Sequence, residues 1–391
     1  MRIEILRLRD FRNYESAELR PHPGVNLIFG RNGSGKTNLL EAVHYCALGK
    51  SHRLSSDREA VRRGAESGAC GVTVVTEGGI RTDIALRISA SPAEKRKTVF
   101  IGRKKAPRIA ELMGHVRCVM FSPEDLQLVR EGPALRRRFT DMLLCQTDPV
   151  YYTALQRYNR ALELRNLLLR EIGPDPGQLR SYEELMAEAA AAVIPRRAKA
   201  LAPLAAIAEE KYRAVSAREG ETFTMAYVPC ADSGSDNLRD LLLDRWKKDR
   251  DEDRIRKGTG FGPHREDIRL RLNGRDMKVF ASQGQVRTAA LAMKLGQLKW
   301  IRGETGETPV LLLDDVMSEL DMERRTRLLD EISGAQTFIT CTDETDLNGL
   351  QEKRTYRVWL EGEHARVEET RQGAKSEQPA PEIDLDEELG N

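Results

Sequence analysis

Residues 30–37 read GRNGSGKT, which fits the pattern G-x-x-x-x-G-K-[ST] of loops that bind the phosphates of nucleoside triphosphates. Gly33 and Gly35 allow the backbone to curl so that its N–H groups converge on an anion. Lys36 would place a cation on the β- and γ-phosphates, and the Thr37 hydroxyl would be a ligand for Mg²⁺. These residue types at this spacing therefore predict the binding of ATP with Mg²⁺.

The segments on either side of this loop have the character that such a loop needs. Residues 25–29 (VNLIF) are typical of a buried strand, and residues 38–43 (NLLEAV) are typical of a helix. A bound phosphate would then lie at the positive end of the helix dipole. A glycine-rich turn that matches by chance would lack this order of strand, loop and helix. We expect the nucleotide to be surrounded by Gly30, Arg31, Asn32, Gly33, Ser34, Gly35, Lys36, Thr37 and Asn38.

A second nucleotide-site element is the apolar segment 309–316 (PVLLLDDV), which ends in two carboxylates. We expect it to form a strand beside the phosphate-loop strand, with Asp314 reaching Mg²⁺ together with Thr37. Asp315 would orient the attacking water or accept its proton, while Lys36 neutralises the phosphates. A lone string of this kind is a weak indication, but it gains weight from the phosphate loop in the same chain.

Two further groups of polar residues flank this strand in the sequence. The first precedes a predicted helix at 286–300 and consists of Ser282, Gln283, Gly284 and Gln285. The second follows the aspartates and includes Ser318 and Asp321. Alone, the first group is an ordinary helix cap. In this order the groups resemble the signature motif, in a variant form, and the D-loop of ATP-binding-cassette (ABC) ATPases. That resemblance implies a homodimer in which Ser282 and Gly284 act on the ATP of the second subunit.

The motifs together resemble the RecF family of bacterial recombination mediators, which are related to the heads of Rad50 and SMC proteins. The resemblance also rests on residues 11–14 (FRNY), 49–53 (GKSHR), 121–126 (FSPEDL) and 262–265 (GPHR), and it extends from residue 1 to about 370. It implies a cytosolic ATPase that dimerises on ATP, binds DNA at single-strand gaps, and helps RecO and RecR to load the recombinase. Further candidates for nucleotide contacts, each equally typical of a surface charge or a loop hydrogen bond, are Arg12, Asn13 and Arg53.

Two departures from the ABC pattern bear on the reaction. ABC ATPases usually carry glutamate after the Mg²⁺ aspartate, whereas this chain has Asp315, and the usual switch histidine is replaced by TCTD at 340–343. The shorter side chain predicts slow hydrolysis. A transporter or motor subunit would show a full signature and a switch histidine, so we favour a DNA-binding protein in which ATP acts as a switch. The alternative is an SMC/Rad50-type clamp or another ABC-type ATPase subunit.

The order of these segments predicts an α/β protein with an ABC-type ATPase lobe, similar to SMC and Rad50 heads, and an inserted, mainly helical second lobe. We assign residues 1–135 and 257–370 to the ATPase lobe and residues 136–256 to the insert. Within the insert, a capping box at Ser181 is expected to open a long alanine-rich helix. Residues 371–391 combine prolines, acids and few large apolar residues, which predicts a disordered acidic tail.

The composition, with 40% hydrophobic and 32% charged residues, is typical of a globular protein, and no apolar run approaches the ~20 residues of a membrane span. Six scattered cysteines, none in a Cys-x-x-Cys pair, fit a reducing cytosol and provide no zinc or disulfide framework. The six acids of the tail reduce the formal charge from +8 for the rest of the chain to a net +2. A basic body of this kind suggests a polyanion as partner.

Three basic clusters are candidate contacts to DNA phosphates, although each is also typical of a solvated surface. They are Arg103, Lys104, Lys105 and Arg108; Arg136, Arg137 and Arg138; and Lys247 and Lys248. Aromatic residues make up only 5% of the chain, which disfavours binding dominated by base stacking. We therefore expect DNA to be bound mainly through its backbone, with little sequence preference.

Overall fold

The computed structural model describes residues 1–51, 53–54, 56–91, 97–171, 173, 175–216, 218, 220–343 and 353–370. The chain divides into two compact units, which are Met1–Glu124 with Ile301–Asn391, and Asp125–Trp300. The second unit is thus one continuous segment inserted into the first. It is wider than the predicted 136–256, however, because it also contains residues 125–135 and 257–300. The predicted acidic tail, residues 371–391, lies outside the described residues.

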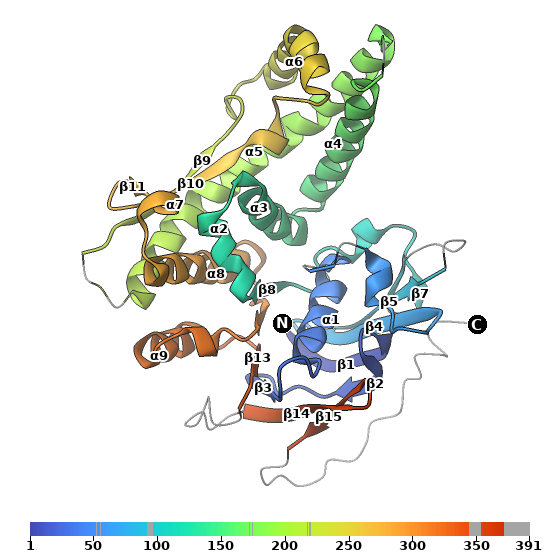
Figure 1. Ribbon diagram of the computed structural model, residues 1–391, viewed down its shortest axis with the longest axis vertical. Helices are drawn as coiled ribbons and strands as arrows, with labels where there is room; N and C mark the ends of the chain where they lie inside the picture. Colours follow the sequence, from blue (N-terminus) through green and yellow to red (C-terminus); the bar gives the residue numbers. More distant parts are fainter. Residues whose placement is uncertain are drawn as a thin grey trace. The chain divides into compact units, whose positions relative to one another are not determined.

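The first unit contains two six-stranded sheets, and the helix α1 (Lys36–Leu48) packs against strands of both (Figure 1). One sheet is antiparallel, in the order β2-β1-β4-β5-β6-β7. Its strands are β1 (Arg2–Phe11), β2 (Tyr14–Leu19), β4 (Ser67–Val75), β5 (Arg81–Ser89), β6 (Lys97–Ile101) and β7 (Lys104–Lys105). Strands β4 and β5 form a hairpin around Gly78 and Gly79, and a glycine pair between two alternating segments is typical of such a turn. Helix α1 contacts strands of both sheets and buries Leu39, Leu40 and Val43.

The other sheet of the first unit carries the nucleotide motifs and has the order β15-β14-β3-β13-β12-β8. Its strands are β3 (Val25–Phe29), β8 (Cys118–Phe121), β12 (Val310–Leu313), β13 (Thr337–Cys341), β14 (Lys353–Glu361) and β15 (His364–Glu369). All pairings from β14 to β8 are parallel, so the carboxyl ends of these strands meet at one edge. Helix α9 (Met322–Glu331) follows β12.

The position of β12 differs from the sequence prediction. We expected the strand with the two aspartates to lie beside the phosphate-loop strand β3, but β13 pairs with both and lies between them. Residues 337–341 are buried on both faces, which suits a central strand. The consequence is that the end of β13 lies between the phosphate loop and Asp314.

The second unit is built on α5 (Pro176–Val215), a 40-residue helix that packs against α4 (Pro149–Leu168) and α6 (Leu238–Arg256). We call these three helices the helical arm (Figure 1). The remaining elements are α2 (Gln127–Arg130), α3 (Pro133–Thr147), α7 (Met277–Phe280), α8 (Gln283–Thr305), and a small sheet of β9 (Phe223–Val228), β10 (Asp267–Leu272) and β11 (Arg275–Asp276). Across both units, short 3-10 turns lie at Asp57–Ala60, Ile109–Leu112, Pro123–Leu126, Pro263–Arg265 and Met317–Glu319.

The core of the helical arm explains why these helices associate. Tyr158, Met186, Ile194 and Trp246 come from all three helices and are almost completely buried together. The predicted start of α5 was wrong: Asp175 is the N-cap, with its side chain accepting from the Gly177 N–H. Ser181 lies inside the helix, where its hydroxyl bonds the Gly177 carbonyl, because the helical pattern continues upstream to Pro176.

Three contacts explain why the second unit extends beyond the predicted insert. Strand β10 pairs along its whole length with β9, which lies inside the insert. Arg136 on α3 forms an ion pair with Asp267 on β10, the Nε–Oδ1 distance being 2.7 Å. Gly296 on α8 faces Ala208 of α5, where a Cβ would come within 3.5 Å. The segment that follows residue 256 thus shares the core of the insert. No helix of the described chain is long and apolar enough to cross a membrane.

Candidate functional site

The loop between β3 and α1 has the geometry expected for phosphate binding. Its first residues, Arg31, Asn32 and Gly33, are exposed, whereas Ser34, Gly35 and Lys36 are buried. Gly35 has φ +114°, and a Cβ there would lie 2.8 Å from the Asn13 amide, so only glycine fits. The exposed turn leads directly into the N-terminus of α1, where the helix dipole favours an anion.

Lys36 is folded back onto its own loop. Its Nζ donates to the carbonyl oxygens of Gly30 and Arg31, at 2.7 and 3.1 Å. Burial lowers the pKa of Lys36, while nearby acidic groups, Asp315 first among them, act in the opposite direction. In the described part of the chain, the hydrogen bonds of the ammonium group go to these two carbonyls, and a β- or γ-phosphate would be a stronger partner because it carries full negative charge.

Thr37 and Asp314 meet at the edge of the parallel sheet, as the sequence predicted. The Thr37 hydroxyl donates to Asp314 Oδ1 over 2.8 Å, although 277 residues separate the two in the chain. Burial raises the pKa of Asp314, and the hydrogen bonds from Thr37 and Thr340 only partly offset this. A hydroxyl and a buried carboxylate are the oxygen ligands that Mg²⁺ accepts beside the phosphates, and a cation here would stabilise the ionised carboxylate. Among the described residues, no cluster of three or more His, Cys, Asp or Glu side chains could hold a metal.

Thr340 is a site residue that the sequence analysis missed. Its hydroxyl lies at the end of β13, donates to Asp314 Oδ1 at 2.8 Å, and accepts the backbone N–H of Asp315 at 2.8 Å. One hydroxyl therefore orients the Asp314 carboxylate and the Asp315 backbone. The sequence placed a segment without histidine at this position but gave no reason to assign a role to threonine. Knowledge that β13 lies between β3 and β12 would have identified Thr340 as a candidate site residue.

Asp315 has an unusual backbone conformation. Its φ is +54°, in the left-handed region that residues other than glycine rarely adopt. Ser318 supports this turn by donating its hydroxyl to the Asp315 carbonyl at 2.8 Å, and its Oγ is 3.4 Å from Asp315 Oδ1. The predicted D-loop serine thus contacts the predicted catalytic residue. Asp321, the other predicted D-loop residue, is the N-cap of α9 and accepts from the Arg324 N–H at 2.9 Å.

Arg12 and Asn13 lie against the phosphate loop and the start of α1. The Asn13 amide donates to the Ser34 carbonyl at 3.2 Å and accepts from Asn38 Nδ2 at 2.7 Å. Arg12 Nε forms an ion pair with the fully buried Glu41 at 3.2 Å. Both residues therefore position the loop in this structure, and direct nucleotide contact by either one stays a prediction. Arg53 is exposed.

The predicted signature residues lie in the second unit, at the start of α8. Ser282 and Gln283 are exposed. Ser282 and Gln285 form a reciprocal cap, in which the Ser282 N–H donates to Gln285 Oε1 at 2.8 Å and the Gln285 N–H lies 3.4 Å from Ser282 Oγ. Gln285 Nε2 also donates to Glu221 at 2.7 Å, and Gly284 accepts the Thr288 hydroxyl. The motif is thus a rigid helix start with an exposed serine.

The three basic clusters have different surroundings. Residues 103–105 and 108 are exposed at and after β7, and Lys247 and Lys248 are exposed on α6. Arg136 is buried, pairs with Asp267, and donates to the carbonyls of Leu128 and Glu131. The prediction that Arg136 contacts DNA was therefore wrong, because its donors are used inside the second unit. Arg137 is half-buried and Arg138 is exposed.

Comparison with known proteins places this geometry in context. Residues 2–365 match the family described as RecF/RecN/SMC N terminal domain. The chain is 41% identical over 354 residues to the DNA replication and repair protein RecF of Symbiobacterium thermophilum, covering 89% of this chain and 93% of that protein. It is 38% identical over 351 residues to RecF of Acetivibrio thermocellus, covering 88% and 94%.

Solved structures agree with these relatives. The recombination mediator protein RecF-ATPrS in the RecFOR pathway superposes with a TM-score of 0.84 at 34% identity, covering 92% of this chain and 96% of that chain. The corresponding RecF-ATP structure gives 0.84 at 32% identity, covering 94% and 97%. The Smc head domain of Pyrococcus furiosus, at 15% identity and a TM-score of 0.55, covering 94% and 96%, shows a shared fold. These likenesses confirm the predicted fold class, an ABC-type head related to SMC proteins.

Proposed function

Because the chain belongs to the RecF family, we propose that it is a cytosolic, ATP-dependent DNA-binding protein of recombinational repair. It dimerises on ATP, binds DNA at single-strand gaps, and promotes recombinase loading together with RecO and RecR. Slow ATP hydrolysis then resets the dimer. The match to proteins named for DNA replication and repair, over about nine tenths of both chains, supports this proposal, as do solved relatives described as RecF-ATP in the RecFOR pathway.

The observation that carries the proposal is the junction of Thr37, Asp314 and Thr340. It brings the phosphate loop and the carboxylate strand into one site whose ligands suit Mg²⁺ and the terminal phosphates of ATP. Lys36 and the loop N–H groups would bind the phosphates, and Thr37 with Asp314 would hold the metal. The metal would neutralise charge on the phosphates and orient the γ-phosphate. Asp315 would position the attacking water.

An SMC- or Rad50-type clamp is the alternative that the fold itself allows. The solved Smc head is described with an extended coiled coil, whereas the insert here is a compact unit of 176 residues, 125–300, with its own core. The alignment to RecF proteins covers about nine tenths of both chains, which favours the recombination mediator.

Replacing Thr340 with valine is expected to slow ATP hydrolysis about tenfold with little loss of ATP affinity. Valine keeps the shape but removes the hydroxyl that orients Asp314 and the Asp315 backbone, and hydrogen bonds to charged groups contribute about 1.5–3 kcal/mol. The measurement is steady-state phosphate release over a range of Mg²⁺ concentrations, with fluorescent-nucleotide binding alongside. The concentration of Mg²⁺ needed for half-maximal rate should rise.

The matched control is Thr337→Val, at the start of the same strand. The Thr337 hydroxyl is buried too, but it bonds the nearby Ala335 carbonyl and touches neither aspartate. This variant should hydrolyse ATP at the parental rate. Parental rates and Mg²⁺ dependence in Thr340→Val would show that Thr340 does not orient the site.

DNA affinity is expected to fall steeply with salt and to depend on ATP more than on ADP. Each duplex phosphate neutralised by the protein contributes about −0.9 to the slope of log K against log salt concentration. Charge reversal at Arg103, Lys104 and Lys105, or at Lys247 and Lys248, should flatten the slope if that exposed cluster touches DNA. Fluorescence anisotropy with a labelled gapped duplex measures both quantities. An unchanged slope after both reversals would place the DNA surface elsewhere.

A further inference from the structure

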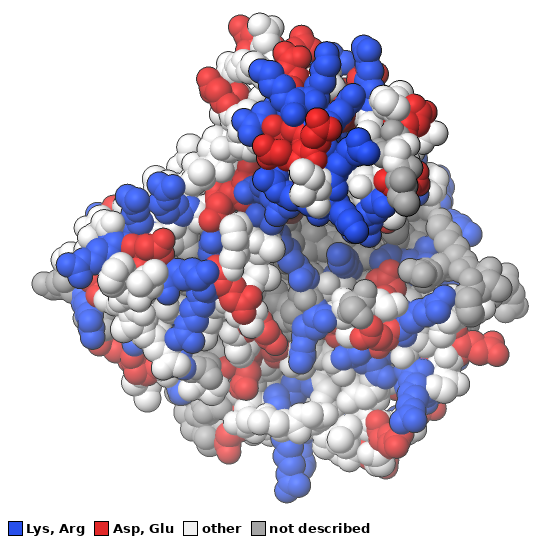
Figure 2. Space-filling view, turned by 45° about the horizontal axis from the view of Figure 1, so that its top comes forward, with Lys and Arg blue, Asp and Glu red and all other residues white. Residues whose placement is uncertain are grey.

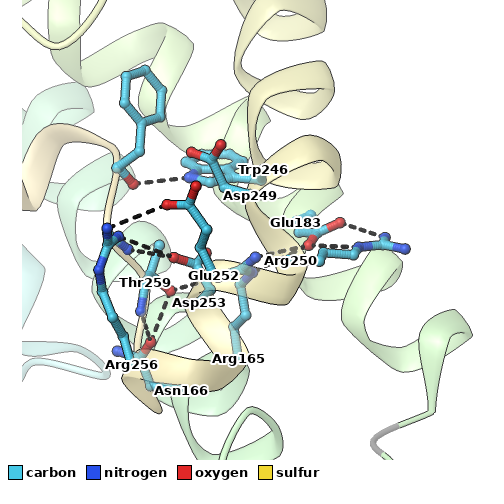
Figure 3. Close-up of polar contacts among 12 residues, drawn as sticks. Arg165, Asn166, Glu183, Trp246, Asp249, Arg250, Glu252, Asp253, Arg256 and Thr259 are labelled. Carbon is cyan, nitrogen blue, oxygen red and sulfur yellow. Dashed lines mark hydrogen bonds and ion pairs between the residues drawn. The ribbon is translucent and has the colours of Figure 1, made fainter.

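The segment 257–266 contains the GPHR motif at 262–265, which the ATP site does not use. It follows α6 and runs through Gly258, Thr259, Gly260 and Gly262 before β10 begins. A loop with this many glycines would ordinarily be mobile. Here buried side chains of the helical arm hold it on both sides, and Figure 3 shows the contacts of the charged side chains and of Trp246. We call this segment the arm loop.

The first set of contacts that holds the arm loop is a buried network of charged residues. Arg165 on α4 is fully buried, and its Nη atoms bond Glu183 on α5 at 3.0 Å and Asp253 on α6 at 2.8 Å. Arg250 adds a second bond to Glu183 at 2.6 Å, and Arg256 Nη1 lies 4.0 Å from Asp253 Oδ1, so three positive groups surround two negative ones (Figure 3). Buried ion pairs of this kind contribute little net stability because of their desolvation cost, but they specify one geometry.

This network ends on the backbone of the arm loop. Arg165 Nη1 donates to the Thr259 hydroxyl at 2.8 Å, and Asn166 Oδ1 accepts from the Thr259 N–H and hydroxyl at 2.8 and 2.7 Å. Asp253 Oδ1 accepts from the Gly260 N–H at 2.8 Å. The loop is thus bound to two helices, α4 and α6, through Thr259 and Gly260.

The second set of contacts lies at the GPHR end of the arm loop. Trp246 Nε1 donates to the Phe261 carbonyl at 2.8 Å, and the Tyr158 hydroxyl lies 2.6 Å from His264 Nδ1. His264 Nε2 is 2.9 Å from the Thr259 carbonyl, which can only accept, so the neutral ring donates there and accepts from Tyr158. Gly262 has φ +129°, and a Cβ would lie 2.5 Å from the Tyr158 hydroxyl, so the backbone is packed without spare room.

These contacts hold three guanidinium groups at the arm loop. Arg265 is exposed and rests on the loop, with Nε and Nη2 donating to the Thr259 carbonyl at 3.3 and 3.2 Å. Arg256, from the end of α6, lies over Gly260 so closely that a Cβ there would be 2.1 Å from its Nη1. Arg137, from α3, donates to the Glu266 carbonyl at 2.7 Å. Arginines from three elements therefore converge on one short loop.

The three guanidinium groups differ in the acidic side chains that neutralise their charge. Arg256 pairs with Glu252 at 3.3 Å, and Figure 3 shows the two side chains facing each other. Arg265 forms no ion pair within the described chain. Burial lowers the pKa of Arg137, and the neighbouring charges of Arg197 and Arg265 act in the same direction, while Asp141 and Asp267 oppose them. Figure 2 shows that Lys and Arg also gather around a smaller acidic group at the α6 end of the helical arm.

We propose that the arm loop, with Arg265 and Arg137 as its donors, binds the phosphodiester backbone of DNA. The inference rests on the proposed DNA-binding function and assigns it a preorganised contact. Fixed guanidinium forks suit phosphate oxygens, and holding them in place in advance reduces the entropy lost on binding. Thr259 is a positioning residue, because it holds Arg265 without carrying charge.

The test compares Arg265→Gln with Arg160→Gln in the full chain. Arg160 is 66% exposed on α4, and two residues after Tyr158 it lies about 200° around the helix, away from the arm loop. Binding to a short fluorescein-labelled duplex is measured by anisotropy with ATP and Mg²⁺ at several salt concentrations. Arg265→Gln should weaken binding about fivefold to tenfold and reduce the salt slope by about one phosphate. Arg160→Gln should match the parent, and Arg265→Lys should retain the parental slope.

A second pair of variants separates charge from positioning. Thr259→Val should weaken binding with an unchanged salt slope, and Thr259→Ser should restore it; thermal melts confirm that each variant is folded. Arg137→Gln provides an independent charge removal with the same expected loss of slope. If the parent binds DNA while Arg265→Gln and Arg137→Gln keep the parental affinity and slope, the arm loop is not a DNA contact. A parent that shows no salt-dependent DNA binding would overturn the proposed function itself, and this inference with it.

Discussion

Ser282→Arg is expected to abolish ATP-dependent dimerisation while leaving ATP binding within about twofold of the parent. Ser282 is exposed at the start of α8, in a different compact unit from the phosphate loop. If its role is to meet the nucleotide of a second subunit, a long cationic side chain there blocks the approach of the two heads. The chain's own Lys36, Thr37 and Asp314 are untouched by the change. Static light scattering after gel filtration, with ATP, with ADP and without nucleotide, measures the effect.

The helix cap needs its own control in this experiment. Ser282 Oγ lies within 3.4 Å of the Gln285 N–H, and loss of an N-cap costs about 1 kcal/mol of stability. Ser282→Thr keeps a capping hydroxyl and should still dimerise, whereas Ser282→Ala loses the cap without adding bulk. Thermal unfolding of all three variants shows how much stability the cap contributes. A Ser282→Arg protein that dimerises on ATP as the parent does would rule out a sandwich of two heads closed by this motif.

The parts of the fold that sequence predicted best are those set by local chemistry. The glycine pair at 78–79 between two alternating segments requires a hairpin, and β4 and β5 form it. The buried strand at 25–29, the phosphate loop and α1 also follow in the predicted order. In each case the residues that determine the element lie within it or next to it in the chain.

The errors concern partners that are distant in the chain. Nothing in residues 309–316 indicates that β13 enters the sheet between β12 and β3, and Thr340 was missed for that reason. The predicted boundary at 257 failed because β10 pairs with β9, and pairing between strands far apart in sequence leaves no local signal. Arg136 was expected on the surface because its neighbours are basic, but a carboxylate 131 residues away binds it.

The largest kinetic effect is expected at Asp315. Asp315→Asn should bind ATP with near-parental affinity, hydrolyse it at least about 100-fold more slowly, and keep the dimer together longer. The side chain loses the carboxylate that would orient the water or accept its proton. Asparagine is nearly the same shape and tolerates the left-handed backbone region, so the turn at φ +54° should remain intact. The bonds from the Asp315 N–H to Thr340 and from Ser318 to the Asp315 carbonyl use the backbone and survive the change.

Lys36→Met is the comparison that separates loss of ATP binding from loss of hydrolysis. The Lys36 ammonium bonds only the carbonyls of Gly30 and Arg31 in the loop, and its proposed partner is the phosphate chain. Removing it should lower ATP affinity roughly tenfold or more, since charge-assisted hydrogen bonds contribute about 1.5–3 kcal/mol, and should prevent dimer formation. Nucleotide titration and single-turnover hydrolysis, measured on both variants, separate binding from chemistry. An equal loss of ATP affinity in the two variants would mean that Asp315 maintains the structure of the site and does not act on the attacking water.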